Sequence, residues 1–147
     1  MKIVLVAIGA RKGGAMEEVA KEYAVRASRY LACETQGFEG EAQFLRWLER
    51  QAGREPAYAI LLDRTGEMLS SEEFAGCMQR LRDGGTQRVV LAIGPADGWS
   101  EAALGRAGKV ISFGRMTLPH ELARVVLAEQ VYRALTILAG HPYHSGH

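Results

Sequence analysis

The chain has 147 residues, of which 48% are hydrophobic and 24% are charged, and its formal net charge is +1. This length predicts one domain, residues 1–147, with a single core. A charge so close to zero excludes nucleic-acid binding through an overall basic field, so an RNA partner would need a local basic patch. The apolar runs are far shorter than the ~20 residues of a membrane span, so no membrane partner is expected.

Short apolar runs alternate with helical patterns along the chain. We expect strands at 2–8, 32–35, 58–62, 88–93 and 109–112, and helices at 15–31, 41–52, 70–83, 100–106 and 119–139. Continuously apolar strands that alternate with helices are typical of a parallel sheet covered on both faces. The predicted fold class is therefore α/β with three layers. The first strand runs straight into "ARKGG" with no cleavage site, which indicates a cytoplasmic protein rather than a secreted one.

Local chemistry marks two of the helices. Ser70 and Glu73 have the spacing of a capping box, and Gly84 and Gly85 end the same helix. The first helix carries an apolar stripe and, on another face, a group of basic residues. This basic face is either exposed to solvent or in contact with a polyanion. The stripe consists of Val19, Tyr23, Ala27 and Tyr30, and the basic face of Lys21, Arg26 and Arg29.

Three unusual loops follow the expected strands, at 61–69, 93–100 and 112–120. Ligands of parallel α/β sheets bind beyond the carboxyl ends of the strands, so these loops are the candidate site. The loop "IGARKGGA" after the first strand matches neither the dinucleotide fingerprint nor the P-loop. Asp63 resembles the phosphoacceptor of a receiver domain, but Arg11 and Lys12 stand near where that domain needs an acidic pair for Mg²⁺.

The last helix and the tail complete the pattern. Pro119 suits a first helical turn, and a helix this apolar is either central to the core or pressed on another subunit, of which we favour a dimer interface. Glu129 and Arg133 have ion-pair spacing.

The tail histidines, His141, His144 and His147, do not complete a metal site, so no metal is expected. Cys33 and Cys77 lack metal or disulfide spacing and are expected to be structural.

Four stretches together resemble the RlmH family of ribosomal RNA methyltransferases, which belongs to the knotted SPOUT superfamily. They are "LLDRTGEMLSSEEFA", "VVLAIGPADGWS", "ISFGRMTLPHELARVVLAEQVYRA" and the terminal "HPYH". The most specific is the run T-x-P-H-x-x-x-R-x-x-x-x-E-Q-x-Y-R-A, from Thr117 to Ala134. The resemblance spans essentially the whole chain and implies a C-terminal trefoil knot, which periodicity does not reveal.

The resemblance also implies an activity and its partners. Members use S-adenosyl-L-methionine to methylate N3 of pseudouridine 1915 in a hairpin of 23S rRNA, on the assembled ribosome and as homodimers. Carried over, the donor pocket would be Leu62, Gly94 and the knot segment Phe113, Gly114, Arg115, Met116, Thr117 and Leu118. Backbone groups of that segment would suit an adenine edge, and its apolar side chains would enclose the ring. The transfer would need neither a metal nor a covalent nucleophile.

Tyr143 and His144 are the candidates that would assist loss of the N3 proton, with delivery across the dimer as one route. A local basic set would grip the RNA, namely Arg11, Lys12, Arg26, Arg115, Arg124 and Arg133, although Arg133 with Glu129 is equally a structural pair. Two alternatives stay open: a donor-binding module without turnover, and a methyltransferase of another RNA. The chain departs from the family at Pro95, at Ser145 and in the acidic stretch 34–43.

Overall fold

The computed structural model describes residues 1–50 and 56–145. Five parallel strands form one sheet in the order β2-β1-β4-β3-β5. The strands are β1 (Lys2–Ile8), β2 (Cys33–Phe38), β3 (Tyr58–Met68), β4 (Arg88–Ile93) and β5 (Lys109–Ser112). The helices are α1 (Ala15–Ala27), α2 (Glu41–Arg50), α3 (Ser71–Asp83), α4 (Glu101–Arg106) and α5 (His120–Ala139), followed by a short 3₁₀ turn η1 (Pro142–His144).

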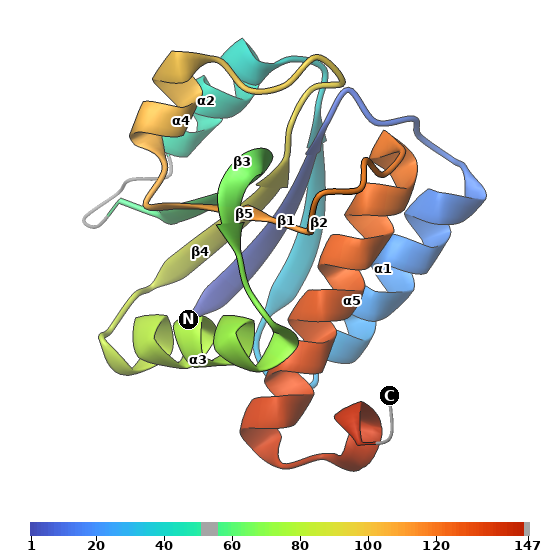
Figure 1. The fold of residues 1–147 in the computed structure, drawn as a ribbon, viewed down its shortest axis with the longest axis vertical. Helices are drawn as coiled ribbons and strands as arrows, with labels where there is room; N and C mark the ends of the chain where they lie inside the picture. The colour runs from blue at the N-terminus through green and yellow to red at the C-terminus, as the bar shows by residue number, and fades with distance from the viewer. Residues whose placement is uncertain (51–55, 146–147) are drawn as a thin grey trace.

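Helices cover both faces of this sheet (Figure 1). Alternate residues of β1 point to opposite sides, so Ile3 and Leu5 join the apolar cluster under α1, α3 and α5. Val4 and Val6 join a second cluster under α2 and α4. Both faces of the strand are apolar because both are covered, which confirms the predicted three-layer α/β class with a parallel sheet.

The capping box predicted at the start of α3 is present. The Ser70 hydroxyl accepts from the Glu73 N–H at 3.0 Å, and the Glu73 carboxylate accepts from the Ser70 N–H at 2.9 Å. Most other predicted boundaries are correct within a few residues. Of the helix expected over 41–52, residues 51 and 52 lie outside the described part of the chain.

The first helix is shorter than predicted, and its buried face is different. It ends at Ala27 instead of continuing to residue 31, and the face against the core consists of Ala20, Ala24 and Ala27. Val19, expected on the apolar stripe, is 37% exposed. Small residues line this face because α1 packs closely along α5, and the larger Tyr23 and Tyr30 lie at the rim of that contact.

The prediction of a loop at 61–69 is wrong, because β3 continues to Met68. β5 pairs with β3 on both sides of an irregularity between Leu62 and Glu67, and Ile111 lies opposite both of those residues. Residues 63–66 therefore bulge out beside β5. Figure 1 shows this part of β3 curving over β5.

Helix α5 is central to the core of its own chain. Its buried residues include Leu127, Val131 and Leu135, and α1 and α3 are its main helical neighbours. Pro119 is the N-cap and not the first helical residue. Most of the apolar surface that we attributed to a dimer interface is thus covered within one chain. None of the helices in residues 1–50 and 56–145 is long and apolar enough to cross a membrane.

Candidate functional site

The candidate site lies at the carboxyl ends of β4 and β5, where β3 reaches Leu62 and then bulges before it continues to Met68. Leu62 of β3 lies in register with Ile93 of β4 and with Ile111 of β5. The next residue after β4 is Gly94, and the segment 113–118 follows β5 directly. The sheet thus brings the parts of the predicted donor pocket, far apart in the sequence, to one edge.

The segment 113–118 contains a sharp, open turn. Gly114 has a φ of +127°, and a Cβ added there would have no atom within 4 Å. The Ser112 hydroxyl holds this turn by accepting from the Gly114 N–H at 3.1 Å and donating to the Gly114 carbonyl at 3.0 Å. Met116 is 88% exposed beyond it. The backbone at Gly114 is therefore accessible, which a backbone-binding ligand requires.

An apolar cavity of about 240 Å³ lies beside this segment. Phe113 and Leu118 line it, together with Ser70 and Ser71 at the start of α3 and Gln130 of α5. Of the eight residues predicted for the donor pocket, these two alone line this cavity. The exposed turn from Gly114 to Thr117 lies outside it.

Trp99 is a residue that the sequence interpretation missed. Its indole Nε1 donates to the Leu62 carbonyl at 3.0 Å, and its ring occupies the space where a Cβ on Gly94 would stand, 2.6 Å from Cε2. The signal was a tryptophan six residues after a buried strand, in a loop otherwise small and polar. Trp99 thereby joins the ends of β3 and β4, and Gly94 is a glycine because the indole leaves no room for a side chain.

The first turn of α5 also reaches this edge of the sheet. The Nε2 atom of His120 lies 2.7 Å from the Gly94 carbonyl oxygen. The Glu121 carboxylate accepts from the Arg11 N–H at 2.8 Å, and Arg124 donates to the Arg11 carbonyl at 3.3 Å. The structure thus gives both His120 and Arg124 partners in other loops.

The six predicted RNA-binding cations fall into two groups. Arg11, Lys12 and Arg115 are exposed in the loops after β1 and β5. The other three are half-buried and paired within the chain, Arg26 with Glu22, Arg124 with Glu121 and Arg133 with Glu129. The structural pair considered for Arg133 is thus formed, at 2.6 Å, and hydrogen bonding to the Glu129 carboxylate raises the Arg133 pKa.

The tail folds back on the far end of α5 (Figure 1). The Tyr143 ring packs edge-on against Tyr132 with ring centroids 4.6 Å apart, and its hydroxyl donates to Glu129 at 3.1 Å. Burial, followed by the Glu129 charge, raises the Tyr143 pKa, so this hydroxyl stays protonated. The Nδ1 atom of His144 is buried without a hydrogen-bond partner among the described residues.

Helix α5 separates the tail from the candidate site in one chain. His120 begins the helix beside Gly94, whereas Tyr143 contacts Glu129 and Tyr132, nine and twelve residues further along. At about 1.5 Å per residue, these contacts lie about 14 and 18 Å from His120 along the helix axis. The structure therefore does not bring Tyr143 and His144 together with the predicted donor residues of the same chain.

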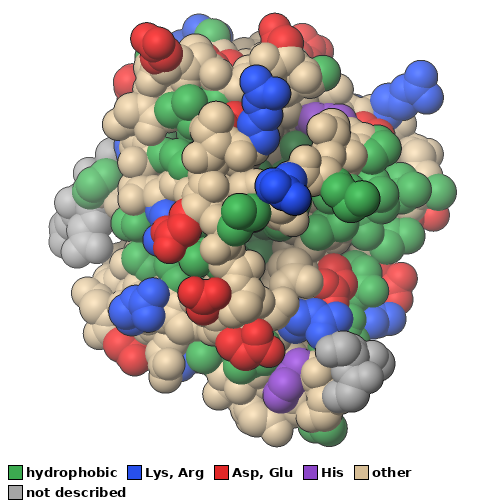
Figure 2. Space-filling view, in the orientation of Figure 1, with side chains coloured by type: hydrophobic (Ala, Val, Ile, Leu, Met, Phe, Trp, Pro, Cys, Tyr) green, Lys and Arg blue, Asp and Glu red, His purple; other side chains and the backbone are tan. Residues whose placement is uncertain are grey.

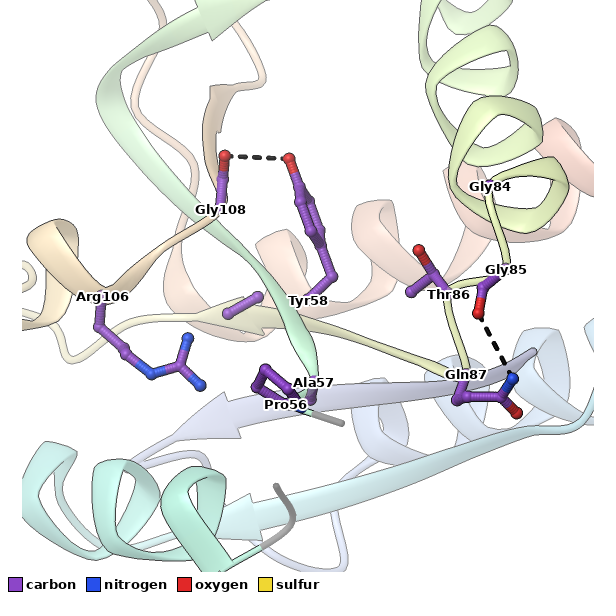
Figure 3. A pocket seen from close by; sticks show the side chains of 10 residues that line it. Pro56, Ala57, Tyr58, Gly84, Gly85, Thr86, Gln87, Arg106 and Gly108 are labelled. Carbon is purple, nitrogen blue, oxygen red and sulfur yellow. Dashed lines mark hydrogen bonds between the residues drawn. The ribbon is translucent and has the colours of Figure 1, made fainter. Parts of the chain in front are cut away.

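A second cavity, of about 370 Å³, opens at the opposite edge of the sheet (Figure 3). It lies where β3, β4 and β5 begin, between Tyr58, Gln87 and Gly108. The Tyr58 hydroxyl donates to the Gly108 carbonyl at 2.9 Å, and Figure 3 shows Arg106 reaching toward Pro56 from the other side. None of the predicted site residues lines this cavity.

The surface carries charges of both signs with no large single-sign field on the face seen in Figure 2. Hydrophobic side chains gather on this face over α1 and α5. The most exposed large apolar residues include Met116, Val25 and Met68. Among the described residues, no group of three or more His, Cys, Asp or Glu side chains could hold a metal ion.

Comparison with known proteins decides the family. A model described as a predicted SPOUT methyltransferase matches residues 1–144. The chain is a SPOUT methyltransferase family member. A relative from Koribacter versatilis strain Ellin345, named ribosomal RNA large subunit methyltransferase H, is 48% identical over 148 residues and covers 100% of both chains. A relative of the same name from Mesorhizobium japonicum is 42% identical and covers 98% of this chain and 99% of its own.

Solved SPOUT-type structures share the fold of this family member. The SpoU methyltransferase AviRb from Streptomyces viridochromogenes, in complex with AdoMet, aligns with a TM-score of 0.57 at 12% identity. An RNA 2'-O ribose methyltransferase aligns with a TM-score of 0.52 at 16% identity. Both alignments cover about 95% of this chain but less than two thirds of the other chain, at 59% and 57%. The resemblance predicted from the sequence is thus confirmed for the family and the α/β fold.

Proposed function

We propose that this protein transfers a methyl group from S-adenosyl-L-methionine to N3 of a pseudouridine in 23S rRNA, on the ribosome. The observation that carries the proposal is full-length identity of 48% to a ribosomal RNA large subunit methyltransferase H, within a SPOUT family match. The accessible backbone of Gly114 at the carboxyl edge supports it, because that edge is where such sheets bind ligands.

The residues present fit a bound methyl donor. Gly114 offers bare backbone with open space beside it, and Phe113 and Leu118 offer apolar surface at the adjoining cavity. When bound, the donor supplies a methyl group on a positively charged sulfur that is a good leaving group. The protein then has to align the RNA base with that methyl and exclude water, which apolar walls of this kind favour.

We extend the proposal to the path of the chain after β5. In a trefoil knot this segment would pass through a loop formed by an earlier part of the chain. The bulge at 63–66 and the close approach of Gly66 to Ile111 support such a crossing, because two backbones pass in contact there.

In a homodimer, the tail residues of the second copy would act at the candidate site of the first copy. Within one chain Tyr143 contacts Glu129 and Tyr132, about 14 to 18 Å along α5 from His120, so its own tail would not serve its own site. Phe113, which lines a cavity together with half-buried Val126, and the exposed Met116 would give the region at the start of α5 an apolar surface for the second copy. Light scattering should give twice the 16.1 kDa chain mass at micromolar concentration, and a monomer would refute this arrangement.

In this arrangement the tail residues take different roles. Tyr143 keeps its proton because burial and Glu129 raise its pKa, and since that proton is donated to Glu129, its hydroxyl oxygen would position groups as an acceptor. His144 has an unpartnered Nδ1 and would accept the proton that leaves N3. The RNA grip would come from Arg11, Lys12 and Arg115, since the other three predicted cations already have partners.

The decisive experiment incubates the protein with labelled donor and intact ribosomes, isolated subunits or bare rRNA, and maps the label by mass spectrometry. Label on N3 of a 23S pseudouridine is the expected result. Label on another RNA would favour a different substrate, and donor binding without label would favour a module without turnover. A ribosomal substrate would also place the protein in the cytoplasm, where ribosomes are found.

A further inference from the structure

The first turn of α5 makes two contacts to loops that are distant in sequence. His120 reaches the Gly94 carbonyl, 26 residues away, with its Nε2 atom at 2.7 Å. The neighbouring Glu121 accepts from the Arg11 N–H, 110 residues away, at 2.8 Å. One turn of helix thus fixes the loop after β4 through His120 and the loop after β1 through Glu121.

His120 does not cap its own helix. The N-cap is Pro119, and α5 has no side-chain cap hydrogen bond. Because a carbonyl oxygen only accepts, the Nε2 atom of His120 must carry the proton and donate. The side chain is 20% exposed, and its Nδ1 faces the Glu121 carboxylate at 4.0 Å. A half-buried imidazole is therefore committed to one backbone carbonyl at the proposed donor edge.

Gly94 is held on its other sides as well. A Cβ at this position would collide with the Trp99 indole, so the backbone lies directly against that ring. The next residue is Pro95, and a residue before proline is confined to extended conformations. Pro95 and Trp99 therefore limit the rotation of the Gly94–Pro95 peptide, and His120 selects the direction in which its carbonyl points.

We propose that His120 is a positioning residue for the methyl donor, which it serves by orienting the Gly94 carbonyl and the loop after β4. This inference rests on the proposed function, because Gly94 is one of the residues assigned to the donor pocket. His120 begins α5 two residues after the segment 113–118. It therefore connects this segment with Gly94, and these are the two parts of the proposed pocket. Its effect falls on donor binding and not on the RNA.

The test compares three variants with the wild type by donor calorimetry and steady-state kinetics. His120→Leu removes the donor atom and keeps the bulk, His120→Gln keeps an N–H at similar reach, and Glu121→Leu removes the matching contact to the other loop. We expect His120→Leu to raise the donor Kd and KM about tenfold, the effect of losing one buried hydrogen bond. The kcat at saturating donor should stay within about twofold.

The other two variants separate positioning from general loosening of the helix. His120→Gln should restore the donor Kd to within about threefold of wild type, and Glu121→Leu should leave it unchanged. Wild-type affinity in His120→Leu, or an equal loss in Glu121→Leu, would overturn the inference. If His120→Leu does not fold, His120→Asn, whose amide is too short to reach Gly94, takes its place with the same expected loss. Absence of donor binding by the wild type would instead overturn the proposed function, and this inference with it.

Discussion

A methyl group on Gly66 would lie 2.5 Å from the carbonyl carbon of Ile111 and 2.7 Å from its Cα and nitrogen. The two residues belong to the bulge of β3 and to β5, so two stretches of backbone pass in direct contact there. Backbone atoms of a paired strand cannot rotate aside as a side chain would. Gly66 is therefore required by the close approach of β5, and not by an unusual φ angle.

We predict that Gly66→Ala lowers the free energy of unfolding by about 3 kcal/mol, the upper range for forcing a methyl into packed structure. Urea denaturation followed by circular dichroism measures this. Gly105→Ala is the matched control, because Gly105 lies in α4 with no atom within 4 Å of the added Cβ. That change should stabilise the protein by about 0.5–1 kcal/mol, as alanine does within a helix. Equal stability of the two variants would contradict the close approach.

Gly114→Val should abolish donor binding while the protein remains folded. The added side chain has space, but it fills the approach to the backbone, and the φ of +127° adds strain of about 1–3 kcal/mol. Gly85→Val carries the same kind of strain at a φ of +87°, also with no atom within 4 Å, at the opposite edge of the sheet. Calorimetry should find donor affinity lost in the first variant and retained in the second. Unchanged affinity in Gly114→Val would show that this turn is not the pocket.

Ser145→Arg should raise the methylation rate on ribosomes at subsaturating concentration. Ser145 is exposed just after η1, at a position where the sequence departs from the family that it resembles, and a charge-assisted contact from an arginine there would contribute about 1.5–3 kcal/mol. The rate should rise about tenfold or more, whereas the donor Kd should not move, since the donor site uses other loops. An unchanged rate would mean that Arg11, Lys12 or Arg115 already supplies this charge.

The thiols should be inert in the folded protein at pH 8. Burial, together with the Glu34 charge, raises the pKa of Cys33 to about 12, so only about one molecule in ten thousand carries the reactive thiolate at that pH. Cys33 is half-buried, and Cys77 is fully buried. A chromogenic disulfide reagent should react slowly with native protein and find two thiols in denaturant. Fast reaction at Cys33 without denaturant would contradict its burial.

The same shift gives a dependence of stability on pH. The folded state keeps the Cys33 proton up to a pKa of about 12, whereas the unfolded chain releases it near the usual value of 9. The unfolded state therefore binds fewer protons between these values, and the free energy of unfolding falls as pH rises through that window. Cys33→Ser, which has no titrating thiol, should show a smaller fall over the same range.

Local patterns predicted most of the architecture because they act over a few residues. The apolar runs located the five strands, and the Ser70 and Glu73 pair located the start of α3. Neither pattern indicated that β3 continues past Asp63, because residues 63–67 are polar and were taken for a loop. The strand continues beyond the bulge because Glu67 and Met68 pair with Ile111 and Ser112 of β5, which lie more than forty positions later in the sequence.

The candidate site was predictable only in part, for the same reason. The sequence shows glycines at 66, 94 and 114, but it does not distinguish the different reasons for them. Gly66 and Gly94 are small because Ile111 backbone and the Trp99 ring lie against them, whereas Gly114 has a positive φ in open space. The role of His120 depends on its distance from Gly94, which helix periodicity does not encode.

The order of strands in the sheet has a consequence for synthesis of the chain. β3 is the longest strand, and one of its edges is covered only by β5, which the ribosome makes some forty residues later. Until then the nascent protein exposes a row of unpaired backbone groups next to an apolar strand, the kind of surface that attaches to other chains. Fragments that end before residue 109 should therefore aggregate, and binding by a chaperone during translation would be most useful in that interval.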